Sequence, residues 1–503
     1  MPIVTGNGSN SWSVVGAFFR VNYGYKGKYL AEVSGRYDGN SRFPTNQRWG
    51  FFPSGSIGWR ISEEKFMENA KNWLDNLKIR ASVGTAGNGN ASPYSYLSTV
   101  AISKNNSFLV GGSPLIYAGK PSLVPDGLTW EKATTYDLGI DLEMLNGRLS
   151  IVGDIYRKKT TDMIVVGPEL PAVFGNAAPK GNYADMRTDG WEASISWRDN
   201  IKLGGKDFSY NLKFAFWDNI SKITRYTATT NTLPTNYTTN YYEGMTLGEL
   251  WGYTCNGLFQ SNEEAQTYAD YSKFAQNKIA WQKGDPKYED LNGDGRIDNG
   301  SNRLEDHGDL SIIGNINPHY MFGVNLAANW NGIGLSVFLQ GVMKRDWYPS
   351  PDSGYFWGKY ARPFMWVLGI HNYTDDMYSE EKNNWDTAYW PRMTTYQSNS
   401  SYSWTKLLEI PNTRYKQNAA YLRVKNIQVD YTFPKALCQK IRLGGLKIYL
   451  SGENLFTFTP LHKYAPNFDP EALGYDTDFS STAGDGYTYP VLKSVTLGVN
   501  ITF

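Results

Sequence analysis

The chain has 503 residues, and its 49 basic and 48 acidic side chains leave a formal net charge of +1, which favours neither nucleic acid nor an anionic surface as a partner. An aromatic content of 15% together with 50 glycines is typical of an extended all-β protein, and no run of about 18 apolar residues is present to cross a membrane as a helix. The two cysteines, Cys255 and Cys438, lie far apart without metal-type spacing, so neither a disulfide scaffold nor a zinc site is expected.

About thirteen segments of the chain alternate apolar and polar residues with the period of two that is typical of β-strands. In chain order they cover residues 12–24, 28–38, 49–61, 75–87, 132–145, 148–160, 184–198, 206–221, 319–330, 333–344, 419–433, 445–457 and 490–503. Several are longer than the five or six residues of a usual strand, and about ten tilted residues are what a strand needs to cross a bilayer. One short helix is predicted within residues 62–72, where Ser62 would cap a first turn that holds Glu63 and Glu64.

Local signals fix how neighbouring strands connect. The Asn-Gly dipeptides at 146–147 and 331–332 predict tight hairpins. In the strand predicted at 419–433 the apolar phase shifts halfway, which predicts a β-bulge at Lys425 and Asn426.

The connections alternate in length along the chain. Short ones lie near Lys26 and at 146–147, 199–205, 331–332 and 434–444, and long ones cover 88–131, 161–183, 222–318, 345–418 and 458–489. Short periplasmic turns and long extracellular loops are typical of outer-membrane β-barrels. A soluble sandwich or propeller is the alternative, because period two also describes half-buried sheets. Loops of 74 and 97 residues are uncommon in compact soluble domains, so the sequence favours the barrel.

The polar face of the predicted strands carries charged residues. In a barrel these side chains would point into a wet lumen. They are Asp137, Asp141, Glu143, Glu192 and Arg198.

The long connection at 345–418 holds seventeen aromatic residues. Aromatic faces with nearby Asn and Asp suit sugar stacking and the bonding of hydroxyl groups. The alternative is that these rings pack a small core of the loop itself. The candidate substrate-binding residues are Trp347, Tyr355, Trp357, Trp366, Trp385 and Trp390.

Residues 288–298, YEDLNGDGRID, have the spacing of an EF-hand-type calcium loop. The oxygen donors would be Asp290, Asn292, Asp294, the carbonyl of Arg296, and Asp298. Position 12 should be a bidentate acid but is Ser301, and the next acids come only at Glu305 and Asp306. We therefore expect weak Ca²⁺ binding at best, and an Asx-rich turn with purely local hydrogen bonds is the competing interpretation.

Catalytic patterns are lacking in the sequence. The four histidines, His307, His319, His371 and His462, are dispersed, and no HExxH, GxSxG or P-loop pattern occurs. We predict that the protein is not an enzyme and that it requires no cofactor.

Several stretches form an ordered set from about Phe18 to Phe503: RVNYGYKGKYLAEVSGRYDGNSRFPTNQRWGFFPSGSIGWRISEEKFM, DLNGDGRID, IIGNINPHYMFGVNLAANWNGIGLSVFLQGV, YLRVKNIQVDYTFP, LSGENLFTFT and SVTLGVNITF. This set resembles the SusC/RagA family of TonB-dependent outer-membrane transporters. The resemblance implies a 22-stranded barrel plugged by an N-terminal domain, with a signal peptide and a TonB-contacting segment before the plug.

None of those regions precedes Met1, and no signal-peptide pattern opens the sequence. We therefore expect residues 1–503 to form the C-terminal portion of such a barrel, about 13 antiparallel strands, without the N-terminal plug, the TonB box or the signal peptide. Thirteen antiparallel strands would not close in the even-numbered way of bacterial single-chain barrels.

The resemblance also implies a function. It is TonB-dependent import of a nutrient, an oligosaccharide before a peptide, across the outer membrane of a Gram-negative, Bacteroidota-like bacterium. The implied partners are outer-membrane lipid, a SusD-like lipoprotein, the TonB complex and a glycan or peptide substrate, and no nucleic acid. A carbohydrate-binding or adhesin-type surface β-protein without transport is the competing hypothesis.

Overall fold

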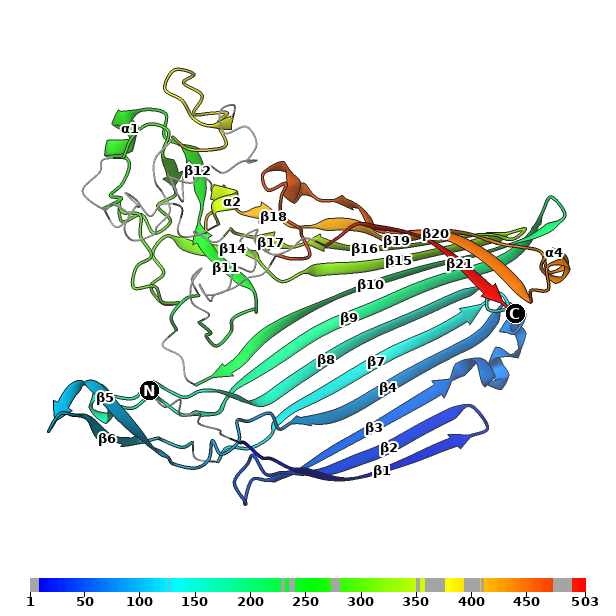
Figure 1. The fold of residues 1–503 in the computed structure, drawn as a ribbon, viewed down its shortest axis with the longest axis horizontal. Helices are drawn as coiled ribbons and strands as arrows, with labels where there is room; N and C mark the ends of the chain where they lie inside the picture. Colours follow the sequence, from blue (N-terminus) through cyan, green and yellow to red (C-terminus); the bar gives the residue numbers. More distant parts are fainter. Residues whose placement is uncertain are drawn as a thin grey trace.

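The computed structural model describes residues 9–125, 127–227, 231–234, 240–272, 281–349, 353–357, 376–392, 408, 411–473 and 491–503. Its main feature is a sheet of thirteen strands in which every neighbouring pair is antiparallel (Figure 1). In sheet order these are β1 (Val14–Tyr25), β2 (Tyr29–Asn40), β3 (Trp49–Arg60), β4 (Leu74–Asn88), β7 (Glu131–Met144), β8 (Leu149–Val166), β9 (Lys180–Leu203), β10 (Lys206–Tyr226), β15 (His319–Trp330), β16 (Ile333–Lys344), β19 (Tyr421–Thr432), β20 (Gly445–Phe458) and β21 (Ser494–Thr502). The prediction of thirteen antiparallel strands is confirmed.

The predicted and observed strands differ most at β8 and β9. These strands have 18 and 24 residues, whereas the apolar alternation predicts 148–160 and 184–198. The additional residues near the long connections are 161–166 of β8 and 180–183 of β9, where Asp162 and Lys180 interrupt the hydrophobic pattern while the ladder between the two strands continues to Val166 and Lys180. The ladder therefore extends beyond the part of each strand that hydrophobicity marks.

Turn and bulge predictions are confirmed in detail. Between β15 and β16, Asn331 and Gly332 both have positive φ, +47° and +88°, as a tight hairpin turn requires. In β19 the register with β16 skips Lys425, since Leu339 pairs with Val424 and the preceding residue, Phe338, pairs with Asn426.

The prediction of a capped helix within residues 62–72 is wrong about the kind of helix. The segment forms two 3-10 turns, Ile61–Glu63 and Lys65–Ala70, and no side chain caps either of them. Glu64 is the N-cap residue of the second turn, but its side chain does not cap that turn and binds residues at the start of β2. Its carboxylate accepts hydrogen bonds from Tyr29 Oη at 2.7 Å and from Lys28 Nζ at 3.0 Å.

The long connections contain smaller elements that the sequence analysis treats as loop. A hairpin of β5 (Val100–Val110) and β6 (Ser113–Pro121) lies between β4 and β7. The other small elements of the long connections are β11 (Glu249–Tyr253), β12 (Cys255–Leu258), α1 (Asn262–Thr267), β13 (Pro286–Tyr288), β14 (Leu310–Asn315), β17 (Asp346–Trp347), α2 (Gly354–Trp357), β18 (Gln417–Asn418) and the 3-10 turns Ala172–Phe174 and Pro460–Lys463. The short connection between β19 and β20 holds the helix α4 (Lys435–Lys440).

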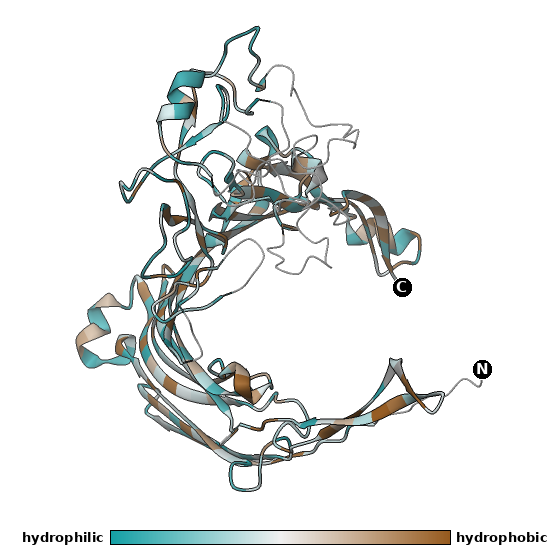
Figure 2. Cartoon of the chain, turned by 90° about the vertical axis from the view of Figure 1, so that its left-hand side faces the viewer, coloured by the Kyte–Doolittle hydropathy of each residue, from teal (hydrophilic) through white to brown (hydrophobic). Residues whose placement is uncertain are grey.

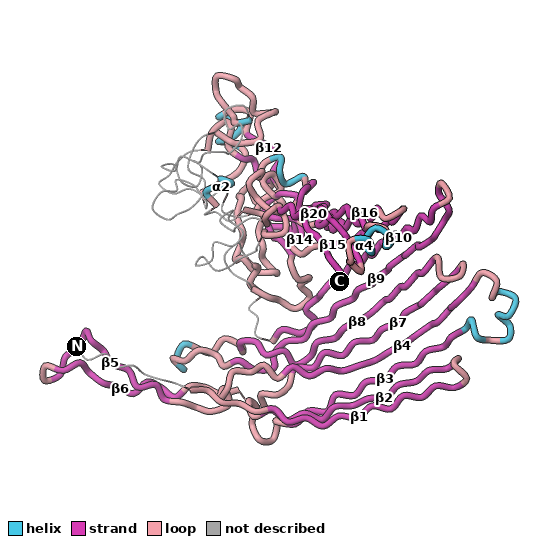
Figure 3. The backbone as a smooth tube through the Cα atoms, turned by 45° about the vertical axis from the view of Figure 1, so that its right-hand side comes forward, coloured by secondary structure: helices cyan, strands magenta, loops and turns pink. Residues whose placement is uncertain are grey.

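The sheet curves into an open arc, with β1 and β21 as its two edges (Figure 2). The short turns lie at one end of the strands, and the long connections gather at the other end (Figure 3). In the described part of the chain no helix is long and apolar enough to cross a membrane. Both cysteines are free thiols.

Candidate functional site

One face of the sheet is apolar and exposed. On β7 it presents Tyr136, Leu138 and Ile140, which are 48%, 49% and 41% exposed. On β21 it presents Val495 and Leu497, whose exposed fractions are 69% and 73%. Burying such a continuous apolar surface requires either another protein layer or lipid, and no protein layer covers it among the described residues.

The opposite face carries a network of ion pairs centred on Arg80 of β4. Its guanidinium lies 2.6 Å from Asp154 on β8, and 3.2 and 3.3 Å from Asp141 and Asp137 on β7. Lys78 pairs with Asp141 at 3.1 Å. These side chains share one face because the register sets Lys78 opposite Asp141 and Ser82 opposite Asp137.

Gly139 allows this network to form. It lies on β7 between Arg80 and Asp154, and a β-carbon there would stand 2.5 Å from both Arg80 Cζ and Asp154 Oδ1. A side chain at this position would block the contact across the strand. Gly139 has the extended backbone of an ordinary strand residue, so an unusual φ does not require a glycine here. The glycine is needed because the side chains of Arg80 and Asp154 come close to its α-carbon.

The other charges predicted to face the lumen lie on the same polar face. Glu192 stands opposite Asp154 in the register of β8 and β9. Arg198, near the short-turn end of β9, donates from Nε to the carbonyl of Gly147 at 2.8 Å. The polar face is thus charged along the length of the central strands.

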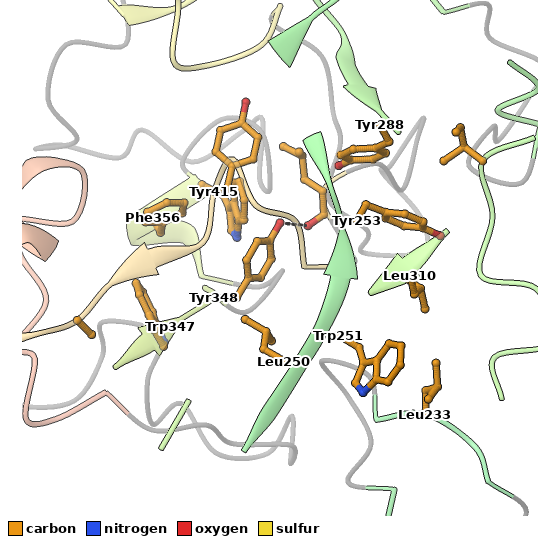
Figure 4. Close-up of a cluster of buried hydrophobic side chains, with 14 of the residues drawn as sticks. Leu233, Leu250, Trp251, Tyr253, Tyr288, Leu310, Trp347, Tyr348, Phe356 and Tyr415 are labelled. Atoms are coloured by element: carbon orange, nitrogen blue, oxygen red, sulfur yellow. Dashed lines mark hydrogen bonds between the residues drawn. The ribbon is translucent and has the colours of Figure 1, made fainter. Parts of the chain in front are cut away.

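Three long connections, which follow β10, β16 and β20, pack together at one end of the strands. Most of their buried side chains form one hydrophobic cluster that we call the loop core. Figure 4 shows Trp347, Tyr348, Phe356 and Tyr415 of the second connection gathered near Trp251 and Tyr253 of β11. The loop core also includes Tyr288, Leu310, Trp357, Trp390, Leu461 and Phe468.

Arginines join the three connections through buried polar contacts. Arg345, just after β16, donates to the carbonyls of Ile316, Pro470 and Leu473 at 3.2, 2.9 and 2.6 Å. Burial lowers the pKa of Arg345. In addition, Arg392 forms a two-pronged pair with the fully buried Asp285, at 2.5 and 3.1 Å.

The third connection is also held to β19. Arg423, 3% exposed, lies 2.5 Å from Asp469, and Lys425 lies 2.7 Å from Glu471. Burial alone would raise the pKa of Asp469, but the Arg423 guanidinium and the backbone N–H of Glu471 outweigh it, so this pKa lies below its usual range.

The predicted substrate-binding residues fall into different environments. Trp347, Trp357 and Trp390 are 3%, 0% and 1% exposed, so their ring faces are covered by the loop core. Tyr355 is 39% exposed, and Trp385 packs partly buried beside Leu258, Tyr378 and Ala388. Trp366 lies outside the described residues. Their role in substrate binding stays a prediction, and in this structure the three buried indoles serve as packing.

The calcium-like loop is a series of local turns. Asp290 accepts hydrogen bonds from the N–H groups of Gly293 and Gly295 at 2.7 and 2.8 Å. Asn292 accepts from Asp294 N at 3.0 Å, and Asp294 accepts from Arg296 N at 2.8 Å. Asp298 accepts from Gly300 N at 2.7 Å. Within the described residues, no group of three or more His, Cys, Asp or Glu side chains converges in a way that would hold a metal ion.

Asp309 closes this loop, although no motif in the sequence marks it as part of the loop. It is 1% exposed and accepts from Leu291 N and Asp298 N at 2.8 and 2.9 Å. Burial raises the pKa of Asp309 despite these hydrogen bonds. The only sequence signal is an aspartate directly before the apolar run of β14, which does not reveal a contact with residues 11 and 18 positions earlier.

A long antiparallel sheet with an apolar outer face, an ion-paired inner face and long connections at one end defines the wall of a transmembrane β-barrel. Residues 3–305 match the family described as TonB dependent receptor-like, beta-barrel. The chain belongs to this family of TonB-dependent receptor barrels.

Comparisons with individual proteins agree with this assignment. The chain is 28% identical to the TonB-dependent receptor P3 of Formosa agariphila, over 98% of this chain and 46% of that protein. It is 25% identical to the TonB-dependent receptor SusC of Bacteroides thetaiotaomicron, over 98% and 44%. The solved structure of the RagAB peptide transporter has the same fold, with a TM-score of 0.69 at 22% identity over 98% of this chain and 48% of that one. The resemblance to SusC/RagA proteins is confirmed, and the chain spans about half the length of the curated relatives it matches.

Proposed function

We propose that this chain forms part of the wall of an outer-membrane barrel that imports a nutrient with energy supplied through the TonB complex. The observation that carries the proposal is the division of one sheet into two faces. The apolar face of β7 and β21 suits lipid, and the face with Arg80, Asp137 and Asp154 suits a water-filled passage.

For the substrate we propose an oligosaccharide. Carboxylate and guanidinium groups on the polar face are suited to bind sugar hydroxyls, and exposed aromatic rings such as Tyr355 are suited to stack on sugar rings. A peptide is the second candidate. It is favoured by the fold shared with RagAB, which is described as a peptide transporter, and by the ability of the same charged groups to bind peptide backbones and side chains.

The partners of the proposed transporter follow from the same reasoning. A SusD-like lipoprotein would cover the side that holds the loop core, and the TonB complex would act from the short-turn side. The outer membrane of a Bacteroidota-like bacterium is the proposed location, in line with the relatives from Formosa and Bacteroides.

Two experiments test the proposal. The intact gene product should fractionate with the outer membrane, and recovery from the soluble fraction without detergent would contradict the barrel. Deletion of the gene should abolish growth on one glycan or one peptide source, with complementation by the wild-type gene as the control. Surface binding of a glycan by cells that show unchanged uptake would instead favour an adhesin-type protein.

A further inference from the structure

The outer face of the sheet changes character along β8 and β9. Near the middle of the strands this face is apolar, with Ile155 of β8 and Ile195 of β9, which are 59% and 46% exposed. Closer to the long connections the same face becomes charged, beginning with Arg157 and Asp189. β9 has 24 residues, more than twice the roughly 10 tilted residues that cross a bilayer. Its end near the long connections, which we call the upper end, therefore extends beyond the membrane.

Contacts between the charged side chains show that they share one face. Arg157 lies 2.5 Å from Asp189, and Arg187 lies 3.0 Å from the same carboxylate. Lys159 lies over the ring of Tyr136, 5.9 Å from its centroid, and Tyr136 belongs to the apolar outer row of β7.

A β-bulge brings a further cation to this face. The register of β9 and β10 shifts between Ile223 and Arg225, so Ile223 points into the loop core while Arg225 reaches Asp185 at 2.8 Å. Arg225 also lies 3.7 Å from Asp162, and Lys132 of β7 lies 3.6 Å from that same aspartate.

Together these residues form a basic patch across four strands. Its cations are Lys132, Arg157, Lys159, Arg187, Lys222 and Arg225. Lys222 is exposed and stands opposite Arg187 in the register. Six cations and three aspartates, Asp162, Asp185 and Asp189, leave a net charge of +3. Asp218, one outer-face position below Ile220, is already paired with His319 at 2.9 Å.

The patch lies directly above an apolar and aromatic surface. Asp189 is two residues from Trp191 on the same face of β9, a separation of about 7 Å along the strand, and Trp191 packs edge-on against Phe216. Tryptophan and tyrosine at such a boundary are typical of the membrane–water interface. A ligand that contacts both surfaces needs an anionic group to bind the basic patch and hydrocarbon chains to cover the apolar surface.

We propose that the basic patch binds the phosphorylated headgroup of an outer-leaflet lipid, whose acyl chains lie against Leu138, Ile155 and Trp191, which follow one another in the register of β7, β8 and β9. Charge complementarity selects this occupant, because a net charge of +3 at headgroup height attracts phosphate while the apolar face below accepts only hydrocarbon. The inference relies on the proposed outer-membrane location and adds a lipid site to it.

The test measures lipid that stays bound to the intact gene product purified from outer membranes in mild detergent. The variant K132Q/K159Q/K222Q removes three exposed charges of the patch, and K26Q/K202Q/K206Q is the matched control at the short-turn end of the sheet. Native mass spectrometry should show at least tenfold less bound diphosphorylated lipid A for the patch variant, and a change of less than twofold for the control. Equal retention by both variants, or an equal loss from both, would overturn the proposal.

A second arm uses the unmodified protein, so it does not depend on the folding of a variant. Diphosphorylated lipid A should bind at least tenfold more tightly than its dephosphorylated form, and inorganic phosphate should not displace it at equal concentration. Equal binding of both lipid forms, or displacement by phosphate alone, would contradict a lipid site. Failure to fractionate with the outer membrane would instead count against the proposed function, so the two failures are distinguishable.

Discussion

Arg80 and Asp154 lie on strands that are not neighbours in the sheet, yet their side chains meet at 2.6 Å across β7. The contact depends on Gly139, which lies between them without a side chain. The side chains of the polar face therefore form a connected network. Within it, a glycine on β7 allows an ion pair to form between β4 and β8.

Replacing Gly139 with alanine should break this contact, because the new β-carbon would stand 2.5 Å from Arg80 Cζ and Asp154 Oδ1. We expect a loss of about 1–2 kcal/mol in unfolding free energy, measured by the temperature at which the barrel unfolds in detergent. Gly153→Ala on the opposite face is the control, since its β-carbon meets Ile140 at an ordinary 3.6 Å. Equal destabilisation by the two variants would show that Gly139 has no special role.

Arg345 should be the residue that holds the third connection to the other two. Arg345→Met leaves the carbonyls of Ile316, Pro470 and Leu473 without their donor, at a local cost of about 3 kcal/mol. Hydrogen exchange of residues 461–473 should then be accelerated by about 100-fold. Arg345→Lys should have an intermediate effect, because an ammonium group cannot reach three carbonyls at once. Unchanged exchange in Arg345→Met would contradict this role.

The contact between Asp469 and Arg423 should make the third connection sensitive to acid. The folded-state pKa of Asp469 is lowered from 3.8, so its stabilisation is complete above about pH 4 and is lost as the pH falls through the lower folded value. Hydrogen exchange of residues 468–473, corrected for intrinsic rates, should therefore increase below that pH. Asp469→Asn should remove the pH-dependent step, and a step that persists in this variant would assign it to another group.

We expect the 290–298 loop to bind Ca²⁺ no more tightly than millimolar. Position 12 is Ser301, and the side-chain oxygens of Asp290, Asn292 and Asp294 already accept backbone N–H groups. Calorimetric titration of the intact protein should show no saturable heat below millimolar Ca²⁺. A micromolar binding event that disappears in Asp290→Asn would establish the calcium site that the spacing suggests.

Much of the sheet is predictable from the sequence, because alternation with period two and Asn-Gly turns are local signals. All thirteen strands and the bulge at Lys425 follow from them. The end of β8 at 161–166 and the start of β9 at 180–183 are missed because Asp162 and Lys180 interrupt the apolar alternation there. The hairpin of β5 and β6 is missed because its strands lack a continuous apolar face.

The loop core is not predictable from the sequence, for a physical reason. Its contacts join segments far apart in the chain, such as Arg345 and Leu473, which are 128 residues apart. Aromatic composition identifies the 345–418 connection as special but does not distinguish a buried Trp357 from an exposed Tyr355. Asp309 is missed for the same reason, because its partners are backbone groups that no residue pattern marks.

We expect one face of the sheet to contact lipid and the other to contact water. Ser194 and Ile195 are adjacent on β9 and point to opposite faces, since Ile195 pairs across to Phe214 in the apolar row and Ser194 to Ala215. Single cysteines placed at these positions, with Cys255 and Cys438 replaced by serine, should differ in intact membranes. A water-soluble maleimide should label Ser194→Cys but not Ile195→Cys, and a fluorophore at Ile195→Cys should be quenched by brominated lipid. Equal labelling at both positions without lipid quenching would contradict the assignment of one face to lipid and the other to water.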